Sequence, residues 1–305
     1  MKSDLGRREQ EGGTGDAHAR AAWSTGLRHA PLFSPLLILA LTAVAHAQAP
    51  APETLRAGAI FLQTQVHSLE DDQRLLALFE GLRVADVADG MDAVGLQNVG
   101  LMEPAIGPLW KDVERFSHRI IGVAVTARYV PTNRPPAGRM TSSEEYDKWA
   151  GAWYSELSGE PFADVLRPGS VLVIDDASAA DVGSIGSNNI MGWKARGMVG
   201  VVTNATARDT DEIALQRVPL YFRHPGRGIR PGRNEIESVN RPVVCGGVLV
   251  MPGDIVVGDG DGVIVVPRAQ AEAVARYARA VIEKDKAARR KLYEQLGLPE
   301  DDSVR

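Results

Sequence analysis

Three stretches of the chain carry apolar residues at helical spacing. The first begins at Ser68, a suitable N-cap residue followed by acidic residues, and it ends before Gly81. The second covers residues 84–94, and the third is a long stretch over about 270–295 with a mixed-charge outer face. This pattern predicts three amphipathic helices. A further helix is predicted over residues 141–158, because Ser142 and Ser143 precede an acidic start and aromatic residues follow at helical spacing.

Apolar, β-branched runs of strand length occupy the rest of the chain. The run 120–130 is the longest, and a Pro-Gly turn introduces the run 168–176. The run 218–222 contains a proline, which predicts a strand at a sheet edge. The basic stretch 224–240 has the composition of a turn-rich loop. Further short strands, joined by Pro-Gly-Asp and Asp-Gly-Asp-Gly turns, are predicted at 242–251, 255–257 and 263–266.

A glycine-punctuated loop, a short helix and a strand follow one another in residues 183–203. Gly183 and Gly186 bracket the loop, Gly197 ends the helix, and the strand covers 198–203. Together with the preceding strand this is a β-α-β unit, so two of its strands should be parallel neighbours in one sheet. The chain shows no internal repeat. We therefore expect one compact layered α/β domain with parallel and antiparallel short strands, flanked by helices.

Composition narrows the range of functions. The 305 residues carry a net charge of −5, with 44% hydrophobic and 24% charged residues. This is the balance of an ordinary globular domain, and it leaves no basic footprint for nucleic acid. Cys245 is the only cysteine, which excludes an intrachain disulfide framework and a cysteine-rich zinc site.

The N-terminal 47 residues have the three-part layout of a secretory signal peptide. Arg20 and Arg28 precede an apolar run at 36–44, and Ala45-His46-Ala47 has the form of a cleavage site. The run is too short for an ordinary membrane span, so we expect no stable span after cleavage and an exported, periplasmic or secreted protein. The alternatives are an uncleaved anchor, or an over-extended translation start that would leave the protein cytoplasmic.

A cation and an anion stand side by side where strand 198–203 ends. Asp209 offers the oxygen ligand that Mg²⁺ prefers, and Arg208 offers a fork for a carboxylate or carbonyl oxygen. The backbone N–H groups at the helix start, residues 187–189, can bind an anion. Such a group would hold a 2-oxo acid, with the arginine on the oxygen where enolate charge develops. The alternative is a buried structural Arg–Asp pair.

Other catalytic motifs do not occur in the chain. It has no G-x-S-x-G elbow, no Walker A loop and no H-E-x-x-H. The pair Gly183 and Gly186 lacks the third glycine of a dinucleotide-binding fingerprint. These absences leave the Arg-Asp pair as the main chemical candidate.

Several blocks, in order along the chain, resemble the RraA-like family. That family includes 4-hydroxy-4-methyl-2-oxoglutarate aldolases and oxaloacetate decarboxylases of the class II, divalent-metal type. The resemblance covers residues from about 70 to 290, and the matching blocks are 87–89, 122–126, 168–175, 186–197, 200–203, 208–209, 246–247, 252–254 and 259–267.

The resemblance implies a fold, an assembly and residue roles. It implies a layered α/β domain that forms homotrimers or hexamers with sites between subunits. Aldolase members carry an Asp, then twenty residues, then Arg-Asp; here the second half matches, but Ser187 stands at the first position. The family roles place the substrate oxyanion on Arg208 and Mg²⁺ or Mn²⁺ on Asp209. Substrate-binding positions fall on Gly186, Asn188 and Asn189.

The resulting hypothesis is a metal-dependent carbon–carbon lyase acting on a small 2-oxo acid, with Arg208 and Ser187 in the catalytic group. The alternative is a non-catalytic RraA-like binding or regulatory protein. We divide the chain into a leader (1–47), a linker (48–68), an RraA-like domain (69–297) and a tail (298–305).

Overall fold

The central element is a mixed eight-stranded sheet. The computed structural model describes residues 61–176 and 181–305, so the predicted leader lies outside the described residues. Along the sheet the strands follow the order β1-β7-β5-β3-β2-β12-β13, and β9 also pairs with β2. The parallel strands are β2 (Ile120–Pro131), β3 (Ser170–Asp176), β5 (Met198–Thr203) and β7 (Leu220–Phe222). The parallel pairing of β3 with β5 confirms the predicted β-α-β unit.

Antiparallel strands complete the sheet. The twelve-residue β2 pairs with β12 along its first part and with β9 along its last part, while β3 runs along its other edge. The mixture of parallel and antiparallel short strands confirms the predicted fold class. The antiparallel members are β1 (Gly107–Pro108), β9 (Asn234–Val239), β12 (Ile255–Asp259) and β13 (Gly262–Val266).

Two small sheets accompany the central one. One contains β4 (Gly183–Ile185), β6 (Thr206–Ala207) and β8 (His224–Pro225), all parallel. The other is a hairpin of β10 (Val243–Cys245) and β11 (Val248–Val250). The three-stranded sheet of β4, β6 and β8 matters for function, because it joins the glycine loop to the segment that carries Arg208.

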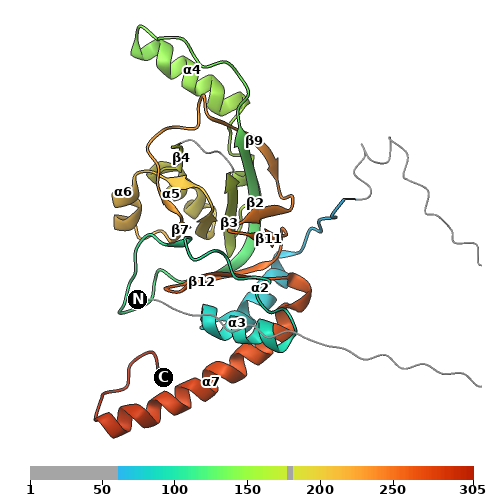
Figure 1. Ribbon diagram of the computed structural model, residues 1–305, viewed down its shortest axis with the longest axis vertical. Helices are drawn as coiled ribbons and strands as arrows, with labels where there is room; N and C mark the ends of the chain where they lie inside the picture. Colours follow the sequence, from blue (N-terminus) through green and yellow to red (C-terminus); the bar gives the residue numbers. More distant parts are fainter. Residues whose placement is uncertain (1–60, 177–180) are drawn as a thin grey trace, which may run out of the picture. The chain divides into compact units, whose positions relative to one another are not determined.

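The helices pack on different parts of the sheet (Figure 1). In one hydrophobic cluster α2 (Leu69–Phe79), α3 (Val84–Ala93) and α7 (Ala271–Leu296) meet β12 and β13. In a second cluster α5 (Ser187–Ala195) and α6 (Thr210–Leu215) pack with β3 and β5. The helix α4 (Ser143–Glu156) projects from the rest of the domain, and two 3₁₀ turns cover Pro161–Val165 and Arg268–Gln270. In the part of the chain that is described, no helix is long and apolar enough to cross a membrane.

The predicted strand 242–251 is wrong as a single element, because it is a hairpin. Gly246 and Gly247 both have positive φ, 56° and 79°, and form the two-residue turn between β10 and β11. Glycine tolerates this conformation, and positive φ at both central positions is typical of tight hairpin turns.

The predicted loop 224–240 and the predicted edge strand 218–222 are also corrected. The predicted loop contains β9, whose residues pair with the second half of β2. This pairing forms because the second half of the long strand β2 has backbone N–H and C=O groups that need hydrogen-bond partners. The strand β7 is not at the edge, since β1 pairs with it on its outer side. Pro219 precedes the paired residues and so removes no hydrogen bond from the sheet.

Candidate active site around Gly186

The short sheet brings the glycine loop beside the Arg-Asp pair. Strand β4 runs parallel to β6, and the Arg208 backbone N–H donates to the Ile185 carbonyl at 2.8 Å. The chain then enters α5 at Ser187, and α6 begins directly after Asp209. Figure 1 shows β4, α5 and α6 grouped together. Ser187 and Asp209, which are 22 positions apart in sequence, therefore lie next to each other in the fold.

Two glycines make room for the side chains of the pair. A β-carbon at Gly183 would lie 2.6 Å from Cβ of Arg208, which is closer than atoms can pack. A β-carbon at Gly186 would lie 2.9 Å from Oδ2 of Asp209, 3.3 Å from Oδ1 of Asn189 and 3.7 Å from Nε of Arg208. Three polar groups therefore converge on the open face of Gly186.

Asp209 links the two helices. Its Oδ2 accepts hydrogen bonds from the Ser187 backbone N–H at 3.0 Å and from the Ser187 hydroxyl at 3.3 Å. A carboxylate at the N-terminus of α5 is stabilised by the helix dipole. Asp209 itself is left-handed, with φ 57° and ψ 37°, a conformation that Asp adopts more readily than most residues. Backbone strain of this kind gathers at functional sites.

The Arg208–Asp209 pair is not a buried structural pair. The Arg208 Nε lies 3.8 Å from Asp209 Oδ1, and the side chains are 38% and 37% exposed. An exposed pair at this distance contributes little to stability. Both charged groups are instead accessible to a small molecule.

The remaining predicted residues lie at the start of α5. The Asn188 side chain is exposed, and its backbone N–H is in the first helical turn together with that of Asn189. The first N–H groups of a helix have no intrahelical acceptor and can bind an anion. The structure thus brings Gly186, Ser187, Asn189, Arg208 and Asp209 together, while Asn188 contributes its backbone.

A partly buried clamp around Glu160, which the sequence did not indicate, orients Asn189. The Asn189 Nδ2 donates to Glu160 Oε1 at 2.6 Å, and Trp193 Nε1 donates to Glu160 Oε2 at 2.8 Å. Arg230, whose side chain is only 4% exposed, forms an ion pair with the same carboxylate and also contacts the Tyr129 hydroxyl. With its amide nitrogen held by Glu160, Asn189 turns its oxygen toward Gly186.

The residues present fit a divalent cation of the Mg²⁺ type. Among residues 61–176 and 181–305, no group of three or more His, Cys, Asp or Glu side chains could hold a metal ion. Mg²⁺, however, commonly takes one or two carboxylates and completes its shell with water and substrate oxygens. Asp209 supplies one exposed carboxylate, and Ser187 supplies a neutral hydroxyl beside it.

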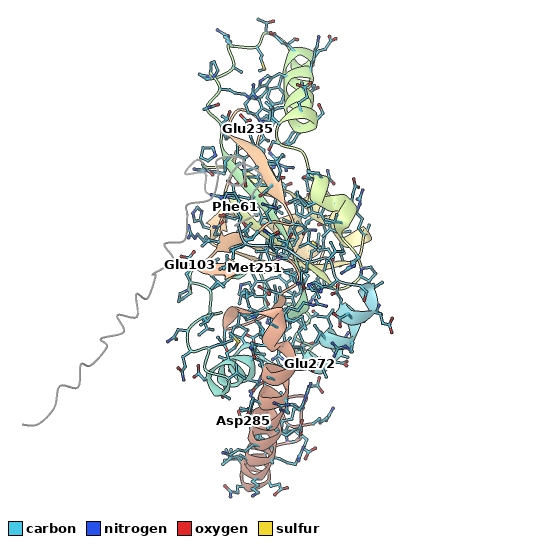
Figure 2. The ribbon with its side chains drawn as sticks, turned by 90° about the vertical axis from the view of Figure 1, so that its right-hand side faces the viewer. Phe61, Glu103, Glu235, Met251, Glu272 and Asp285 are labelled. Atoms are coloured by element: carbon cyan, nitrogen blue, oxygen red, sulfur yellow. The ribbon has the colours of Figure 1, made fainter. Side chains whose placement is uncertain are left out.

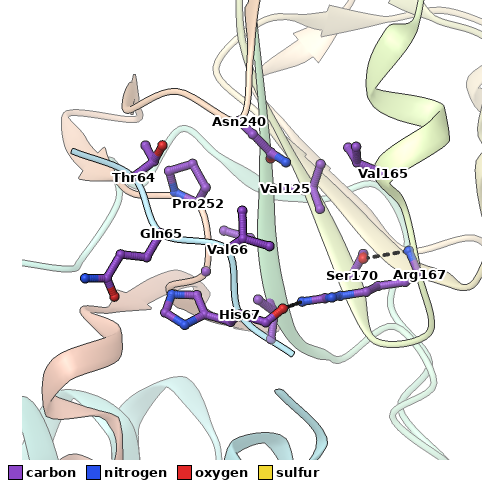
Figure 3. Close-up of a pocket in the computed structure, with 13 residues that line it drawn as sticks. Thr64, Gln65, Val66, His67, Val125, Val165, Arg167, Ser170, Asn240 and Pro252 are labelled. Atoms are coloured by element: carbon purple, nitrogen blue, oxygen red, sulfur yellow. Dashed lines mark hydrogen bonds between the residues drawn. The ribbon is translucent and has the colours of Figure 1, made fainter. Parts of the chain in front are cut away.

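A hollow of about 330 Å³ lies elsewhere in the domain (Figure 3). Residues 64–67 close it over β2, and Arg167 donates a hydrogen bond to the His67 carbonyl across it at 2.9 Å. Burial is the main cause that lowers the pKa of His67 below its usual value, so its ring is neutral at pH 7. Arg167 is already paired with Asp72. This hollow therefore lacks the exposed cation–anion pair found at Gly186.

Gly186→Ala is expected to impair the site without unfolding the protein. Gly186 has φ −121°, which alanine adopts freely, so the effect is the clash of the new methyl group with the Asp209 carboxylate. Displacement by about 1 Å can reduce turnover on the order of 100-fold. Steady-state kinetics with the substrates proposed below measure this loss. Gly192→Ala on the same helix meets no atom within 4 Å and should keep wild-type turnover; equal losses in both variants would contradict the steric explanation.

The fold is that of a layered α/β protein, because helices pack on a mixed sheet. The candidate polar site lies where a strand ends. The chain belongs to the RraA-like family: a model of that family, described as Aldolase/RraA, matches residues 84–265. The match contains the whole glycine loop and the Arg-Asp pair.

Relatives with similar sequences agree with this membership. A Halalkalibacterium halodurans protein named "Putative 4-hydroxy-4-methyl-2-oxoglutarate aldolase" is 35% identical over 125 residues, which are 40% of this chain and 58% of that protein. A protein of the same name from Burkholderia mallei is 32% identical over 99 residues, which are 32% of this chain and again 58% of that protein. The alignments thus span 58% of the length of these relatives.

Two solved structures share the fold. An uncharacterized protein from Pseudomonas syringae pv. tomato is 26% identical with a TM-score of 0.56, covering 74% of this chain and 94% of that chain. Streptomyces coelicolor RraAS2, described as an unusual member of the RNase ES inhibitor RraA protein family, is 22% identical with a TM-score of 0.55. It covers 75% of this chain and 98% of that chain, and it bears on the fold alone.

Proposed function

We propose that this protein is a divalent-metal-dependent carbon–carbon lyase that releases pyruvate from a 2-oxo acid. The substrates considered are 4-hydroxy-4-methyl-2-oxoglutarate, by aldol cleavage, and oxaloacetate, by decarboxylation. The observation that supports this most is the convergence of Asp209, Asn189 and Arg208 on the open face of Gly186. Relatives bearing the aldolase name agree with it.

Both reactions break the bond between the third and fourth carbons of the substrate. The bonding electrons pass to the pyruvate part as an enolate, which then takes a proton from water to give pyruvate. The other product is CO₂ from oxaloacetate, or a second pyruvate after the 4-hydroxyl group of 4-hydroxy-4-methyl-2-oxoglutarate has lost its proton to water. In this proposal the Arg208 guanidinium stabilises the enolate oxygen, since a fixed cation acts most strongly where charge develops. The first-turn N–H groups of Asn188 and Asn189 bind the substrate carboxylate.

Asp209 and Ser187 would hold the cation beside that oxygen. When bound, Mg²⁺ or Mn²⁺ supplies Lewis-acid polarisation of the keto group. Asp209 provides the charge, and its conformation is fixed by the two bonds from Ser187. Because Ser187 is neutral where aldolase members carry Asp, we expect weaker retention of the cation than a two-carboxylate site gives.

Pyruvate release tests the proposal. Purified protein with Mg²⁺ should release pyruvate from at least one of the two substrates faster than the buffer control, and EDTA should abolish the excess. Asp209→Asn should show the same low rate with and without Mg²⁺. If the rate of pyruvate release were unchanged both by EDTA and by Asp209→Asn, a metal-dependent site at Asp209 would be refuted.

One observation favours a second candidate, a non-catalytic RraA-like binding protein. Ser187 places a hydroxyl at the position where aldolase members carry an acidic residue. In that case oxalate, a stable analogue of pyruvate enolate, would bind in titration calorimetry while both substrates remained intact. Ser187→Asp separates the two candidates, because it should raise turnover strongly if this position limits catalysis.

We further propose export to the periplasm or medium, and a homotrimer or hexamer with the site between subunits. The layout of residues 1–47 supports the first proposal, and the family membership supports the second. N-terminal sequencing of exported protein and light scattering test them: a start at Met1 or a monomer would refute the respective proposal.

A further inference from the structure

A basic hollow borders α7, the loop before β2 and the C-terminal residues. It measures about 450 Å³, and none of its lining residues belongs to the Gly186 group. Figure 2 labels Asp285 on α7, and the neighbouring α7 residues Ile282, Lys286 and Arg289 line the hollow. The lining residues include five cations and one acid: Arg83, Arg115, Arg119, Lys286, Arg289 and Asp302.

Only part of this charge is neutralised by the protein. Arg83 is paired with Asp86 and Asp285, and its hydrogen bond to Asp86 is the main cause that raises its pKa. Arg289 donates to the Ser303 carbonyl, and Asp302 pairs with Arg305. Within the described ranges, Arg115, Arg119 and Lys286 form no ion pair with a carboxylate. The charge of Arg289 is also unpaired, because its carbonyl partner is neutral, so four positive charges border this hollow without a carboxylate partner among the described residues. The chain as a whole has a net charge of −5.

Arg119 is held in place by an aromatic ring. Its Nε is buried and has no acceptor among the described residues, while its guanidinium stacks 3.9 Å above the centroid of the Phe116 ring. The ring fixes the guanidinium plane, so the group is already oriented for an anion and loses little entropy on binding.

We propose that this hollow binds a small phosphorylated ligand, a phosphomonoester or a diphosphate. A phosphate group brings close to two negative charges and three acceptor oxygens, which suit Arg115, Arg119 and Lys286 together. A single carboxylate would neutralise only one of the three. Phe116 and Ile282 add apolar wall for the carbon part of an ester. The volume lies within the usual range of ligand sites.

Titration calorimetry at low salt, with the full chain and with pyrophosphate, inorganic phosphate and citrate as probes, tests the proposal. Pyrophosphate should bind most tightly, and its affinity should fall as salt rises, because charge dominates. Lys286→Glu, on a partly exposed helix face, should weaken binding at least about tenfold. Arg119→Gln should act in the same direction, and thermal melting of both variants checks that they fold.

Two control variants make the result specific to the hollow. Lys148→Glu introduces the same charge change on the projecting α4 and should leave pyrophosphate affinity within about twofold. Arg208→Ala should also leave it unchanged, which separates this site from the proposed active site. Absence of pyrophosphate binding, affinity that survives Lys286→Glu, or citrate binding as tight as pyrophosphate would each overturn the proposal.

Discussion

Arg208→Ala is expected to lower kcat for pyruvate release by about 100- to 1,000-fold, with a smaller change in KM. In the proposed mechanism the Arg208 guanidinium stabilises the enolate oxygen, and loss of a single oxyanion donor typically has an effect of this size. Its aliphatic part lies over Gly183 and the side chain is 38% exposed, so its removal should barely change folding stability. Steady-state kinetics of the purified variant measure the loss.

Two further arginine variants control this result. Arg196→Ala removes an exposed arginine at the end of α5 whose side chain donates to the Gly192 carbonyl, and it should keep wild-type kcat. Arg208→Lys keeps the charge but loses the fork, so an intermediate rate is expected. If Arg208→Ala retained kcat within about threefold of wild type, the assignment of the enolate oxygen to this residue would be wrong.

Glu160→Ala is expected to be the most destabilising of these substitutions, lowering the free energy of unfolding by about 3 kcal/mol or more. It leaves the guanidinium of Arg230 buried without its carboxylate, and it removes the acceptor of both Asn189 and Trp193. Urea unfolding at pH 7 measures the change. Turnover should fall as well, because Asn189 is no longer oriented toward Gly186.

Glu156→Ala is the matched control, since it removes an exposed glutamate at the end of α4. Its free energy of unfolding should stay within about 0.5 kcal/mol of wild type. Equal destabilisation by the two substitutions would show that the clamp around Glu160 contributes no more to the free energy of unfolding than an exposed glutamate does. Glu160→Gln adds a second readout: a variant that folds but turns over slowly would assign Glu160 a positioning role.

Local patterns in the sequence were sufficient to predict most of the helices and strands. Ser68 and Ser142 accept the hydrogen bonds expected of N-cap residues, and the parallel pairing of β3 with β5 follows from the β-α-β order. The strand β9 was missed because its sequence is polar and follows a proline- and glycine-rich stretch. It is paired because β2 extends beyond β12, which is a property of the whole sheet.

Only part of the candidate site could be predicted from the sequence, again because local patterns do not reveal contacts between distant segments. Arg208, Asp209 and the start of α5 lie in one continuous β-α-β segment, so their proximity follows from order along the chain. Glu160 and Arg230 lie in other segments, 29 and 41 residues from Asn189, and no local spacing joins them. Arg230 also stands in a basic stretch whose composition favours solvent exposure, yet its side chain is only 4% exposed.

The most direct test of the central claim is exchange of the pyruvate methyl protons with D₂O, followed by proton NMR. An enolate forms at the methyl carbon whichever 2-oxo acid is the natural substrate, so this test does not depend on the substrate. The account predicts enzyme-dependent loss of the methyl signal with Mg²⁺, and no loss beyond the buffer rate with EDTA or with Arg208→Ala. No exchange by the wild-type protein, or equal exchange by Arg208→Ala, would contradict it.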